Sequence, residues 1–345
     1  MVAVVAAGCG GGSASTSTTT SVPATPSAST GPSASSAAAV AKGNWTDTAK
    51  VNPANPNTTL IAVGCASATF CVAIDQGQNS YTFDGSTWGA PISTNGLANV
   101  NEVSCLSPTN CITTDLQGHA ATFDGAAWSA PQLVDPGGIG LTSSSCPTPT
   151  FCAAVNNSGN AFVFNGSSWT AAQAIDPAAA AAVDAVNKGQ GTDVPTLYVS
   201  CPAAGSCVSV DTLGNTMTFA SGTWSAAVPI ASGSHKLFSL SCGAPTSCVS
   251  GERGAFFIFD GTRWGASQTL PQNQGVQASL ISCATSTFCM SASGRWATFD
   301  GSTWTAAEVS SRGPTGNDPL ALDCPTADFC IAVGAFGGAS VYHSN

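Results

Sequence analysis

Two short stretches of the sequence combine charge with an aromatic ring, and they are the first candidates for a ligand site. Glu252 and Arg253 are adjacent, and Arg295 and Trp296 form a second pair about forty residues later. An arginine beside an exposed aromatic ring suits a sugar or a carboxylate, because the guanidinium is a planar donor and the ring has an apolar face. We predict that these four residues form the rim of a binding site. Two alternatives stay open: a solvated turn, or Trp296 buried between structural units.

Acidic residues at one recurring position suggest a second kind of chemistry. They follow an apolar stretch at Asp75, Asp115, Asp211 and Glu252. If the fold brought two of them together they could act as the carboxylate pair of a glycoside hydrolase or a lyase. The alternative is that they form turns and accept backbone hydrogen bonds. No Gly-x-Ser-x-Gly elbow, phosphate loop or His-Glu-x-x-His motif occurs. We therefore predict no catalytic residues and favour a non-catalytic binding module, with the enzyme as the alternative and a scaffold without small ligand as the third possibility.

Fourteen of the fifteen cysteines form pairs with five residues between the two members. The pairs are Cys65 with Cys71, Cys105 with Cys111, Cys146 with Cys152, Cys201 with Cys207, Cys242 with Cys248, Cys283 with Cys289, and Cys324 with Cys330. Regular pairing predicts disulfides and an oxidising, extracytoplasmic location. Zinc is disfavoured, because this spacing is unusual for its ligands and the chain has only three histidines. We expect neither a metal site nor a cofactor.

A second motif, Phe-Asp-Gly-x-x-Trp or a variant of it, follows each of the first six pairs. It ends at Trp88, Trp128, Trp169, Trp224, Trp264 and Trp304. The resulting unit of about 41 residues has the length of a four-stranded propeller blade. The sequence therefore predicts an all-β fold, a seven-bladed β-propeller over residues 41–345, with one disulfide hairpin in each blade. Asp-Gly makes the turn before the fourth strand in four repeats, at Asp84, Asp124, Asp260 and Asp300; Asn165-Gly166 is a conservative substitution and Ala220-Ser221 departs from the pattern.

The two ends of the repeat array complement each other. Gly43-Asn44-Trp45-Thr46 matches the end of a repeat without a preceding cysteine pair, and the seventh repeat stops after Tyr342 without its tryptophan. We expect the strand around Trp45 to complete the last blade and so remove an open edge. Between Trp169 and Cys201 about a dozen residues are inserted. Asp176 and Pro177 are typical of a helix start there, and we place the binding face on the side of this 176–190 insertion.

The repeat resembles the seven-bladed β-propellers of secreted and lipid-anchored bacterial proteins, and Thr82 to Trp88 resembles a shortened Asp-box of the BNR/sialidase-like propellers. The resemblance implies a structural turn between the third and fourth strands, and it bears on the fold only. Sialidases of that family use three arginines from different blades and a Tyr/Glu pair. Here all four arginines lie in the last third of the chain and no glutamate is close to a tyrosine, so we do not expect sialidase activity.

The N-terminal residues have a different composition. Residues 1–9 are apolar up to Cys9, and Ala6-Ala7-Gly8-Cys9 resembles a lipobox, although a positive segment is missing and Leu is usual in place of Ala6. Residues 10–40 consist mainly of Ser, Thr, Pro, Ala and Gly, which predicts a disordered tether. We expect a protein anchored to the bacterial cell membrane through a lipid on Cys9. The alternative is a stray cysteine in a disordered leader.

Charge limits the partners. The chain has 18 acidic and 8 basic residues, a net charge of −10, and no basic run. Nucleic acids and anionic lipids attract clustered Lys and Arg, so we expect neither as a partner and membrane contact only through the anchor. The remaining expectation is a monomer that binds a glycan or a cell-surface protein.

Overall fold

The computed structural model describes residues 43–137, 140–231, 235–269, 280–293, 295–306 and 319–344, and only the backbone of Ser293, Arg295 and Ala306. All of these residues belong to the compact unit Ala38–Asn345. The predicted Cys9 lipidation and the 10–40 tether lie outside the described residues.

The described strands form seven antiparallel sheets, one for each cysteine pair. Blade 1 contains β2 (Leu60–Ser67), β3 (Phe70–Asp75), β4 (Asn79–Phe83) and β5 (Ile92–Ser93). Blade 2 contains β6 (Val100–Ser107), β7 (Asn110–Asp115), β8 (His119–Phe123) and β9 (Gln132–Leu133). Blade 3 contains β10 (Leu141–Thr148), β11 (Phe151–Asn156), β12 (Asn160–Phe164) and β13 (Gln173–Ala174). In each blade, consecutive strands are neighbours in the sheet.

Blades 4 to 6 repeat this order. Blade 4 contains β14 (Leu197–Ala203), β15 (Ser206–Asp211) and β16 (Asn215–Ala220), and both β17 (Thr223–Trp224) and β18 (Val228–Pro229) pair with β16. Blade 5 contains β19 (Ser239–Ala244), β20 (Ser247–Glu252), β21 (Ala255–Phe259) and β22 (Gln268–Thr269). Blade 6 contains β23 (Ile281–Thr285), β24 (Phe288–Ser293), β25 (Arg295–Phe299) and β26 (Trp304–Ala306).

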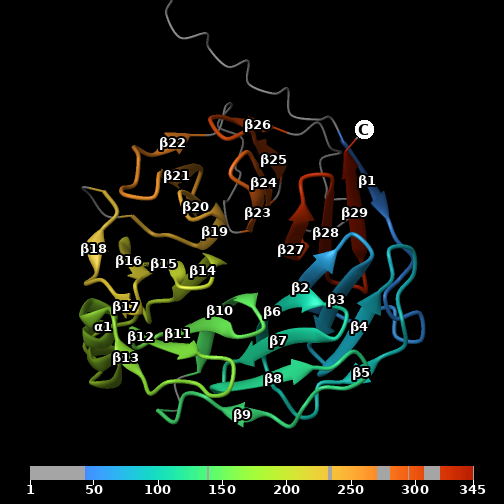
Figure 1. Ribbon diagram of the computed structural model, residues 1–345, viewed down its shortest axis with the longest axis horizontal. Helices are drawn as coiled ribbons and strands as arrows, with labels where there is room; N and C mark the ends of the chain where they lie inside the picture. The colour runs from blue at the N-terminus through green and yellow to red at the C-terminus, as the bar shows by residue number, and fades with distance from the viewer. Residues whose placement is uncertain are drawn as a thin grey trace, which may run out of the picture. The chain divides into compact units, whose positions relative to one another are not determined.

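The ring closes in blade 7. This blade contains β27 (Pro319–Thr326), β28 (Phe329–Gly334) and β29 (Ala339–Ser344), and its fourth strand is β1 (Gly43–Asp47) from the start of the described chain. Trp45 lies opposite Tyr342, which confirms the predicted completion of the last blade. The first strands contact one another in the order β2, β6, β10, β14, β19, β23, β27, and β27 contacts β2 (Figure 1). The predicted seven-bladed propeller is therefore confirmed.

All seven predicted disulfides form, each between the two cysteines of one repeat. In chain order they join Cys65 with Cys71, Cys105 with Cys111, Cys146 with Cys152, Cys201 with Cys207, Cys242 with Cys248, Cys283 with Cys289, and Cys324 with Cys330. Each links the first and second strands of its blade across their turn, with the two Cα atoms 3.9–4.1 Å apart.

These bridges close short loops. A six-residue separation constrains the unfolded chain only slightly, so each bridge is worth about 2 kcal/mol in the loop-entropy model. All fourteen cysteines of the folded unit are thereby occupied, and none of them is a free thiol. The seven bridges indicate an oxidising, extracytoplasmic environment.

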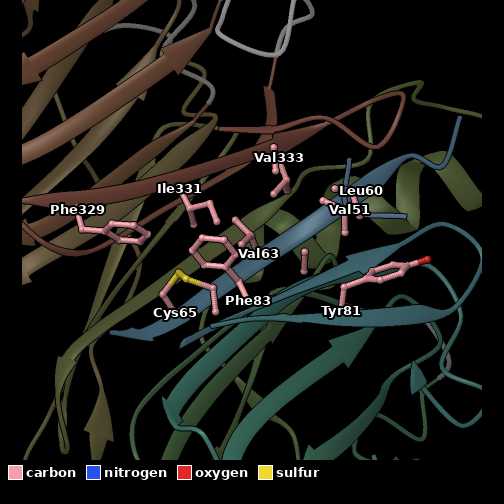
Figure 2. Packing of buried hydrophobic residues seen from close by; sticks show 12 residues of the cluster. Val51, Leu60, Val63, Cys65, Tyr81, Phe83, Phe329, Ile331 and Val333 are labelled. Atoms are coloured by element: carbon pink, nitrogen blue, oxygen red, sulfur yellow. A yellow bond between two sulfur atoms is a disulfide. The ribbon is translucent and has the colours of Figure 1, made fainter. Parts of the chain in front are cut away.

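The apolar core lies between neighbouring blades. Between blades 7 and 1, Phe329 and Ile331 pack against Val63 and Phe83, with the first disulfide beside them (Figure 2). Phe83 in turn packs against the motif tryptophan Trp88, with ring centroids 5.0 Å apart. The period-2 alternation of the strands supplies these side chains, because successive residues point to opposite faces of a blade.

The predicted Asp-Gly turns are confirmed as structural. In blade 1 the Asp84 carboxylate accepts the backbone N–H groups of Ser86 (2.8 Å) and Thr87 (2.7 Å), which holds its pKa well below the ordinary range. Gly85 has φ +94°, a value that glycine adopts without strain. A β-carbon at Gly85 would press against Thr69 of the disulfide hairpin, so the two turns pack closely together.

The insertion between blades 3 and 4 contains the predicted helix. α1 spans Pro177–Asn187, and the Asp176 side chain accepts the backbone N–H groups of Ala178 (3.0 Å) and Ala179 (3.2 Å). Proline at the first position loses no hydrogen bond there, because that N–H has no partner inside a helix.

Candidate functional site

The propeller has two faces with different chemistry. We call one the connection face: it carries the turns between second and third strands, the links between blades, and α1. The opposite one, the hairpin face, carries the disulfide hairpins and the Asp-Gly turns. The first strands line two cavities along the axis of the ring, one toward each face, which together we call the axial channel.

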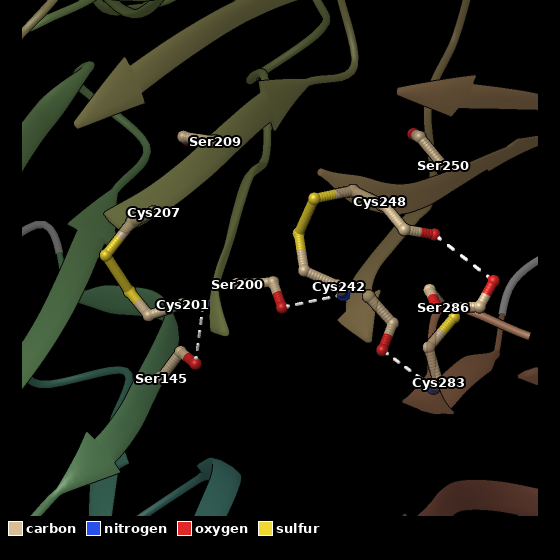
Figure 3. Close-up of a disulfide and its surroundings, with 12 residues drawn as sticks. Ser145, Ser200, Cys201, Cys207, Ser209, Cys242, Cys248, Ser250, Cys283 and Ser286 are labelled. Atoms are coloured by element: carbon tan, nitrogen blue, oxygen red, sulfur yellow. Dashed lines mark hydrogen bonds between the residues drawn. A yellow bond between two sulfur atoms is a disulfide. The ribbon is translucent and has the colours of Figure 1, made fainter. Parts of the chain in front are cut away.

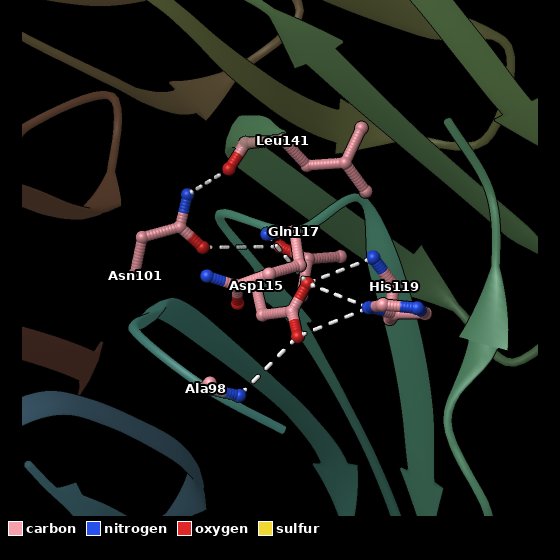
Figure 4. A network of polar contacts seen from close by, with 7 residues as sticks. Ala98, Asn101, Asp115, Gln117, His119 and Leu141 are labelled. Carbon is pink, nitrogen blue, oxygen red and sulfur yellow. Dashed lines mark hydrogen bonds and ion pairs between the residues drawn. The ribbon is translucent and has the colours of Figure 1, made fainter. Parts of the chain in front are cut away.

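The acidic residues of the connection face are turn formers. Asp115 is 1% exposed, and its Oδ1 accepts the N–H groups of Gln117 (3.0 Å) and His119 (2.8 Å), while Oδ2 accepts the N–H of Ala98 (3.3 Å) from the preceding link (Figure 4). Asp211 makes the same turn with Leu213 and Asn215. These carboxylates fix the links to the blades, which is the alternative that the sequence left open for them.

Asp75 in blade 1 shows how strongly such a carboxylate is held. It is 3% exposed, and it accepts the hydroxyls of Tyr81 (2.8 Å) and Thr58 (3.1 Å) and the N–H of Asn79 (2.8 Å). Burial, with the hydrogen bond to Asp75, raises the pKa of Tyr81 to about 12. Asp75 is therefore part of the scaffold and faces no ligand.

The four residues of the predicted rim have different environments. Glu252 ends β20, and its carboxylate contacts His235 Nδ1 (2.9 Å) and accepts the Ser267 hydroxyl (3.0 Å), so it links three segments of blade 5. Arg253 is exposed in the following turn. Arg295 begins β25, but its side chain lies outside the described residues.

Trp296 is in the environment that the sequence analysis gave as the alternative. Its side chain is 4% exposed and its ring centroid lies 4.1 Å from that of Trp45. Together with Phe288 and Tyr342 it packs between blades 6 and 7. A ring in this position offers no free face to a ligand, because alternation along β25 turns it into the interblade core. This burial corrects the expectation that Trp296 lies at an exposed rim.

A feature that the sequence analysis missed is the distribution of exposed apolar side chains. The described residues with large apolar side chains at least 41% exposed are Leu116, Leu133, Val194, Leu213, Val228, Leu320 and Phe336. Leu116, Leu213 and Phe336 stand in turns between second and third strands. Val194 lies in the link after α1, and Leu320 is the second residue of the first strand of blade 7. Leu133 and Val228 pair with the starts of third strands. All seven therefore lie at the connection face.

The hairpin face has the opposite character among the described residues. Its turn carboxylates are the exposed Asp84, Asp124 and Asp260 and the partly buried Asp300. Backbone N–H groups hold the pKa of Asp84, Asp124 and Asp300 below the ordinary value, and for Asp260 the Thr262 hydroxyl does so first, followed by backbone N–H groups. No described large apolar side chain is exposed there. This face is therefore anionic and hydrated.

The axial channel contains two cavities. One, of about 200 Å³, lies toward the connection face and is lined by apolar residues such as Phe238 and Leu320. The other, of about 260 Å³, lies toward the hairpin face and includes the residue before the first cysteine of every repeat, which is serine in five blades.

Four of these serines, Ser145, Ser200, Ser241 and Ser282, join neighbouring blades around the channel. The hydroxyl of Ser145 accepts the N–H of Cys201 (3.0 Å), and Ser200 does the same for Cys242 (3.0 Å) (Figure 3). In blade 7 the position is Asp323, whose Oδ2 accepts the N–H of Cys65 (2.7 Å). This series of interblade hydrogen bonds is therefore anionic at one point.

Glu102 gives the channel a second carboxylate. Its Oε2 accepts the N–H of Ser144 (2.9 Å) and the hydroxyl of Ser143 (3.0 Å), and Glu102 lines both cavities. Burial raises the pKa of Glu102 to about 7, and the nearby charge of Asp323 adds to the shift. Burial also raises the pKa of Asp323 to about 6. No cation among the described residues compensates the two carboxylates, so burial favours their neutral, protonated forms.

No three His, Cys, Asp or Glu side chains gather into a metal-binding group within the part of the chain that the structure describes. Over the same residues, no helix has the length and apolar character needed to span a bilayer.

Comparison with known proteins identifies the fold and no family. No protein-family model matches the chain, and no curated protein matches it. Among solved structures, YCF48 bound to D1 peptide is 16% identical, with a TM-score of 0.63 over 90% of this chain and 99% of that one. Streptogramin B lyase is 6% identical, with a TM-score of 0.70 over 89% and 100% of the two chains. U3-55K is 10% identical, with a TM-score of 0.63 over 83% and 95%.

These neighbours are propeller folds, and at such low identity the likeness extends to the fold alone. The resemblance to the BNR/sialidase-like family gains no matching family model and stays a hypothesis.

Proposed function

We propose that this protein is a non-catalytic, extracytoplasmic binding module that holds a protein partner on its connection face. The observation that carries this proposal is the gathering of every described, exposed, large apolar side chain on that face. Single exposed leucines are ordinary on protein surfaces. Here the seven side chains come from blades 2, 4 and 7 and the link after α1, all on one face, and such a one-sided distribution is informative because exposed apolar side chains mark docking surfaces.

The rigidity of the face supports the same function. Its turns are fixed by buried carboxylates such as Asp115 and Asp211, so Leu116 and Leu213 are held in place before a partner binds. Less conformational entropy is then lost on association. YCF48, which has the same fold, has a solved structure with a bound peptide, which supports a polypeptide as the class of ligand.

A glycan is the other ligand that the sequence suggested. It would use the rim of Glu252, Arg253, Arg295 and Trp296. The burial of Trp296 removes the stacking surface from this set, and Glu252 is engaged by His235 and Ser267. We therefore rank a glycan below a polypeptide. Binding on a glycan array that is lost on Arg253→Ala would reverse this order.

The second candidate function is an enzyme in the axial channel. One observation favours it: Glu102 and Asp323 line one cavity, and burial brings both pKa values near neutrality, where a carboxyl group can act as an acid or a base. A lyase also occurs among the structural neighbours. Turnover of a glycoside or a lyase substrate that Glu102→Gln abolishes, with an unchanged fold, would establish the enzyme.

The location that we propose is the outer side of the bacterial cell membrane, with a lipid on Cys9 and residues 10–40 as a tether. The disulfides support the oxidising compartment, and the lipid remains to be tested. Cys9→Ser should move the protein from the membrane fraction to the medium. A wild-type protein without lipid by mass spectrometry would contradict the anchor.

The binding proposal is tested with peptides selected by phage display on the wild-type protein. Replacing Leu116, Leu213 and Phe336 by serine should weaken the dissociation constant of a selected peptide by about tenfold or more, which corresponds to about 1.4 kcal/mol. The control is Ala126→Ser, an exposed apolar residue on the hairpin face. Unchanged affinity in the triple variant, with an intact fold by circular dichroism, would place the site elsewhere.

A further inference from the structure

Motif tryptophans lie against the preceding blade, and two junctions show a hydroxyl group bound to the indole. The Nε1–H of Trp128 donates to the hydroxyl of Ser80 (2.8 Å), and that of Trp264 donates to the hydroxyl of Thr216 (3.2 Å). Ser80 and Thr216 are each the second residue of a third strand, β4 and β16. A hydroxyl at this position therefore complements the indole N–H across a blade junction.

At two other junctions an aromatic ring takes the same place. Phe256 is the second residue of β21 and stacks on Trp304, with ring centroids 4.1 Å apart. Trp296 is the second residue of β25, and its ring centroid lies 4.1 Å from that of Trp45. The repeat thus shows two kinds of group that fit against the motif indole, a hydroxyl and a flat ring.

The junction between blades 2 and 3 has neither group. The second residue of β8 is Ala120, and a cavity of about 150 Å³ lies between it and Trp169. Trp169 is half-buried, and its Nε1–H has no hydrogen-bond partner among the described residues. A single water needs only about 10–15 Å³ of such space, so the cavity has room for a six-membered ring.

One other blade has alanine at this position, and its tryptophan is covered. Ala161 of blade 3 belongs to the same buried cluster as Trp224, which is 9% exposed and whose N–H is buried. Trp169 differs because its ring borders a cavity that opens to solvent beside exposed residues such as Gln132.

The wall of the cavity combines apolar groups with hydrogen-bonding groups. Ala120, Ala121 and Phe164 supply apolar surface, and all of the described residues that line the cavity are uncharged. The Thr122 hydroxyl and the Gln132 amide are exposed at the cavity and make no hydrogen bond within the part of the chain that the structure describes. Three polar groups, counting the Trp169 N–H, are therefore available to a ligand.

We propose that this cavity, the Trp169 pocket, binds one ring of a neutral sugar. A sugar hydroxyl accepts the Trp169 N–H, as the Ser80 hydroxyl does for Trp128, and the C–H face of the sugar ring packs on the indole. The Gln132 amide and the Thr122 hydroxyl bond further sugar hydroxyls. The ligand is neutral, because a charged ring would lose hydration without meeting an opposite charge.

An aromatic ligand fits these groups less well than a sugar. An aromatic ring would cover the indole, as Phe256 covers Trp304, but it would displace water from the three polar groups without replacing its hydrogen bonds. Polar groups left unpaired in this way weaken binding. A sugar ring has both an apolar face and hydroxyl groups for all three.

The Trp169 pocket is separate from the proposed polypeptide site and from the predicted rim. It lies on the outer strands of blade 2 and beside the turn before the fourth strand of blade 3. The rim residues Glu252, Arg253, Arg295 and Trp296 belong to blades 5 and 6. The pocket would thus give the protein a second ligand, of a different chemical class.

The first measurement follows the indole N–H signal of Trp169 by NMR in the full-length protein. The signal is assigned by its loss in Trp169→Phe. The probes are the methyl glycosides of glucose, galactose and mannose, and at least one of them should shift the signal saturably with a Kd of about 10 mM or tighter. Absence of a saturable shift with all three would overturn the proposal, and so would saturation by p-cresol alone.

The second measurement repeats the titration in variants that keep the Trp169 ring. Ala120→Thr places in blade 2 the residue that blade 4 has at this position, so it should fill the cavity, bind the indole N–H and weaken sugar binding at least fivefold. Gln132→Ala should weaken it at least threefold. The control is Ala126→Ser, an exposed change in the neighbouring Asp-Gly turn, which should leave the Kd unchanged.

The other tryptophan signals report whether each variant keeps its fold. Unchanged affinity in a folded Ala120→Thr variant would contradict the pocket. A sugar-dependent shift of the Trp264 signal without one at Trp169 would place the sugar elsewhere and overturn the proposal as well. Neither measurement requires a polypeptide partner, so failure of the proposed function on the connection face leaves this test intact.

Discussion

The two faces of the propeller differ in how closely they follow the repeat. On the hairpin face all seven blades have a disulfide across the first turn. In blades 1, 2, 3, 5 and 6 an Asp or Asn accepts two backbone N–H groups in the second turn; blade 4 departs from this, and blade 7 has no such turn because its fourth strand is β1. On the connection face the blades diverge: the turns present Leu116, Leu213 or Arg253, and one link contains α1. The features that recur among the blades therefore stabilise the ring. The features that differ between blades are the ones by which the protein can recognise a particular partner.

The largest difference in stability is expected between alanine variants of Trp296 and Arg253, two residues predicted for the same site. Trp296→Ala removes a buried ring from the blade 6–7 core and should lower the free energy of unfolding by about 3–5 kcal/mol. Arg253→Ala changes an exposed turn and should be within about 0.5 kcal/mol of the wild type. Urea denaturation of both variants measures this contrast, and equal effects would show that Trp296 is not buried.

A smaller change in stability is expected when Gly64 is replaced by serine, the residue that most other repeats carry at this position. The other repeats carry serine or aspartate before the first cysteine, but a β-carbon at Gly64 would collide with the backbone carbonyl of Val103. Gly64→Ser should therefore destabilise the protein by about 1–3 kcal/mol. Ser104→Gly, the matched change in blade 2, should cost less. A stabilising Gly64→Ser would mean that blades 1 and 2 are not in close contact.

The channel carboxylates should make the protein less stable as the pH rises. Burial raises the pKa of Glu102 to about 7 from 4.5, so stability is lost between about pH 4.5 and 7. Glu102→Gln removes this loss and should raise the melting temperature at pH 8 by a few degrees, with little change at pH 4.5. An equal change at both pH values would show that Glu102 titrates normally.

The smallest effect on stability is expected for a carboxylate of the hairpin face. Its pH dependence is opposite to that of Glu102, because its stabilising contribution is lost as the pH falls. Backbone N–H groups of the Asp300 turn lower its pKa to about 2 from 3.8, so its contribution is present above pH 4 and is lost as the pH falls toward 2. Asp300→Ala should lower the melting temperature by one or two degrees at pH 7 and leave it unchanged at pH 2. A difference that persists at pH 2 would point to lost packing as its cause.

The propeller scaffold could be predicted because its sequence motifs recur at a regular spacing. The regular cysteine pairs and motif tryptophans fix the blade count, and the incomplete repeat at Trp45 predicts which strand closes the ring. The candidate site was predicted poorly for physical reasons. Trp296 stands one residue after a turn, where sequence does not decide which way alternation points a side chain. Glu102 faces the channel only because the first strands of all seven blades converge around the axis. The residues next to Glu102 in the sequence do not indicate this convergence.

The exposed leucines were missed for a related reason. Leu116 directly follows Asp115, and Leu213 lies two residues after Asp211. The sequence analysis considered these aspartates only for their carboxylates, although the apolar residues beside them are visible in the sequence itself. Only the structure shows that these apolar residues share one face.

The central claim, that a polypeptide docks on the connection face, is tested most directly by hydrogen exchange of the full-length protein with and without a saturating, selected peptide. The account predicts slower exchange in the turns 115–118, 211–214 and 334–338 and unchanged exchange in the turns 84–88 and 124–128 of the hairpin face. Protection confined to the hairpin face, or to the first strands that line the channel, would contradict it.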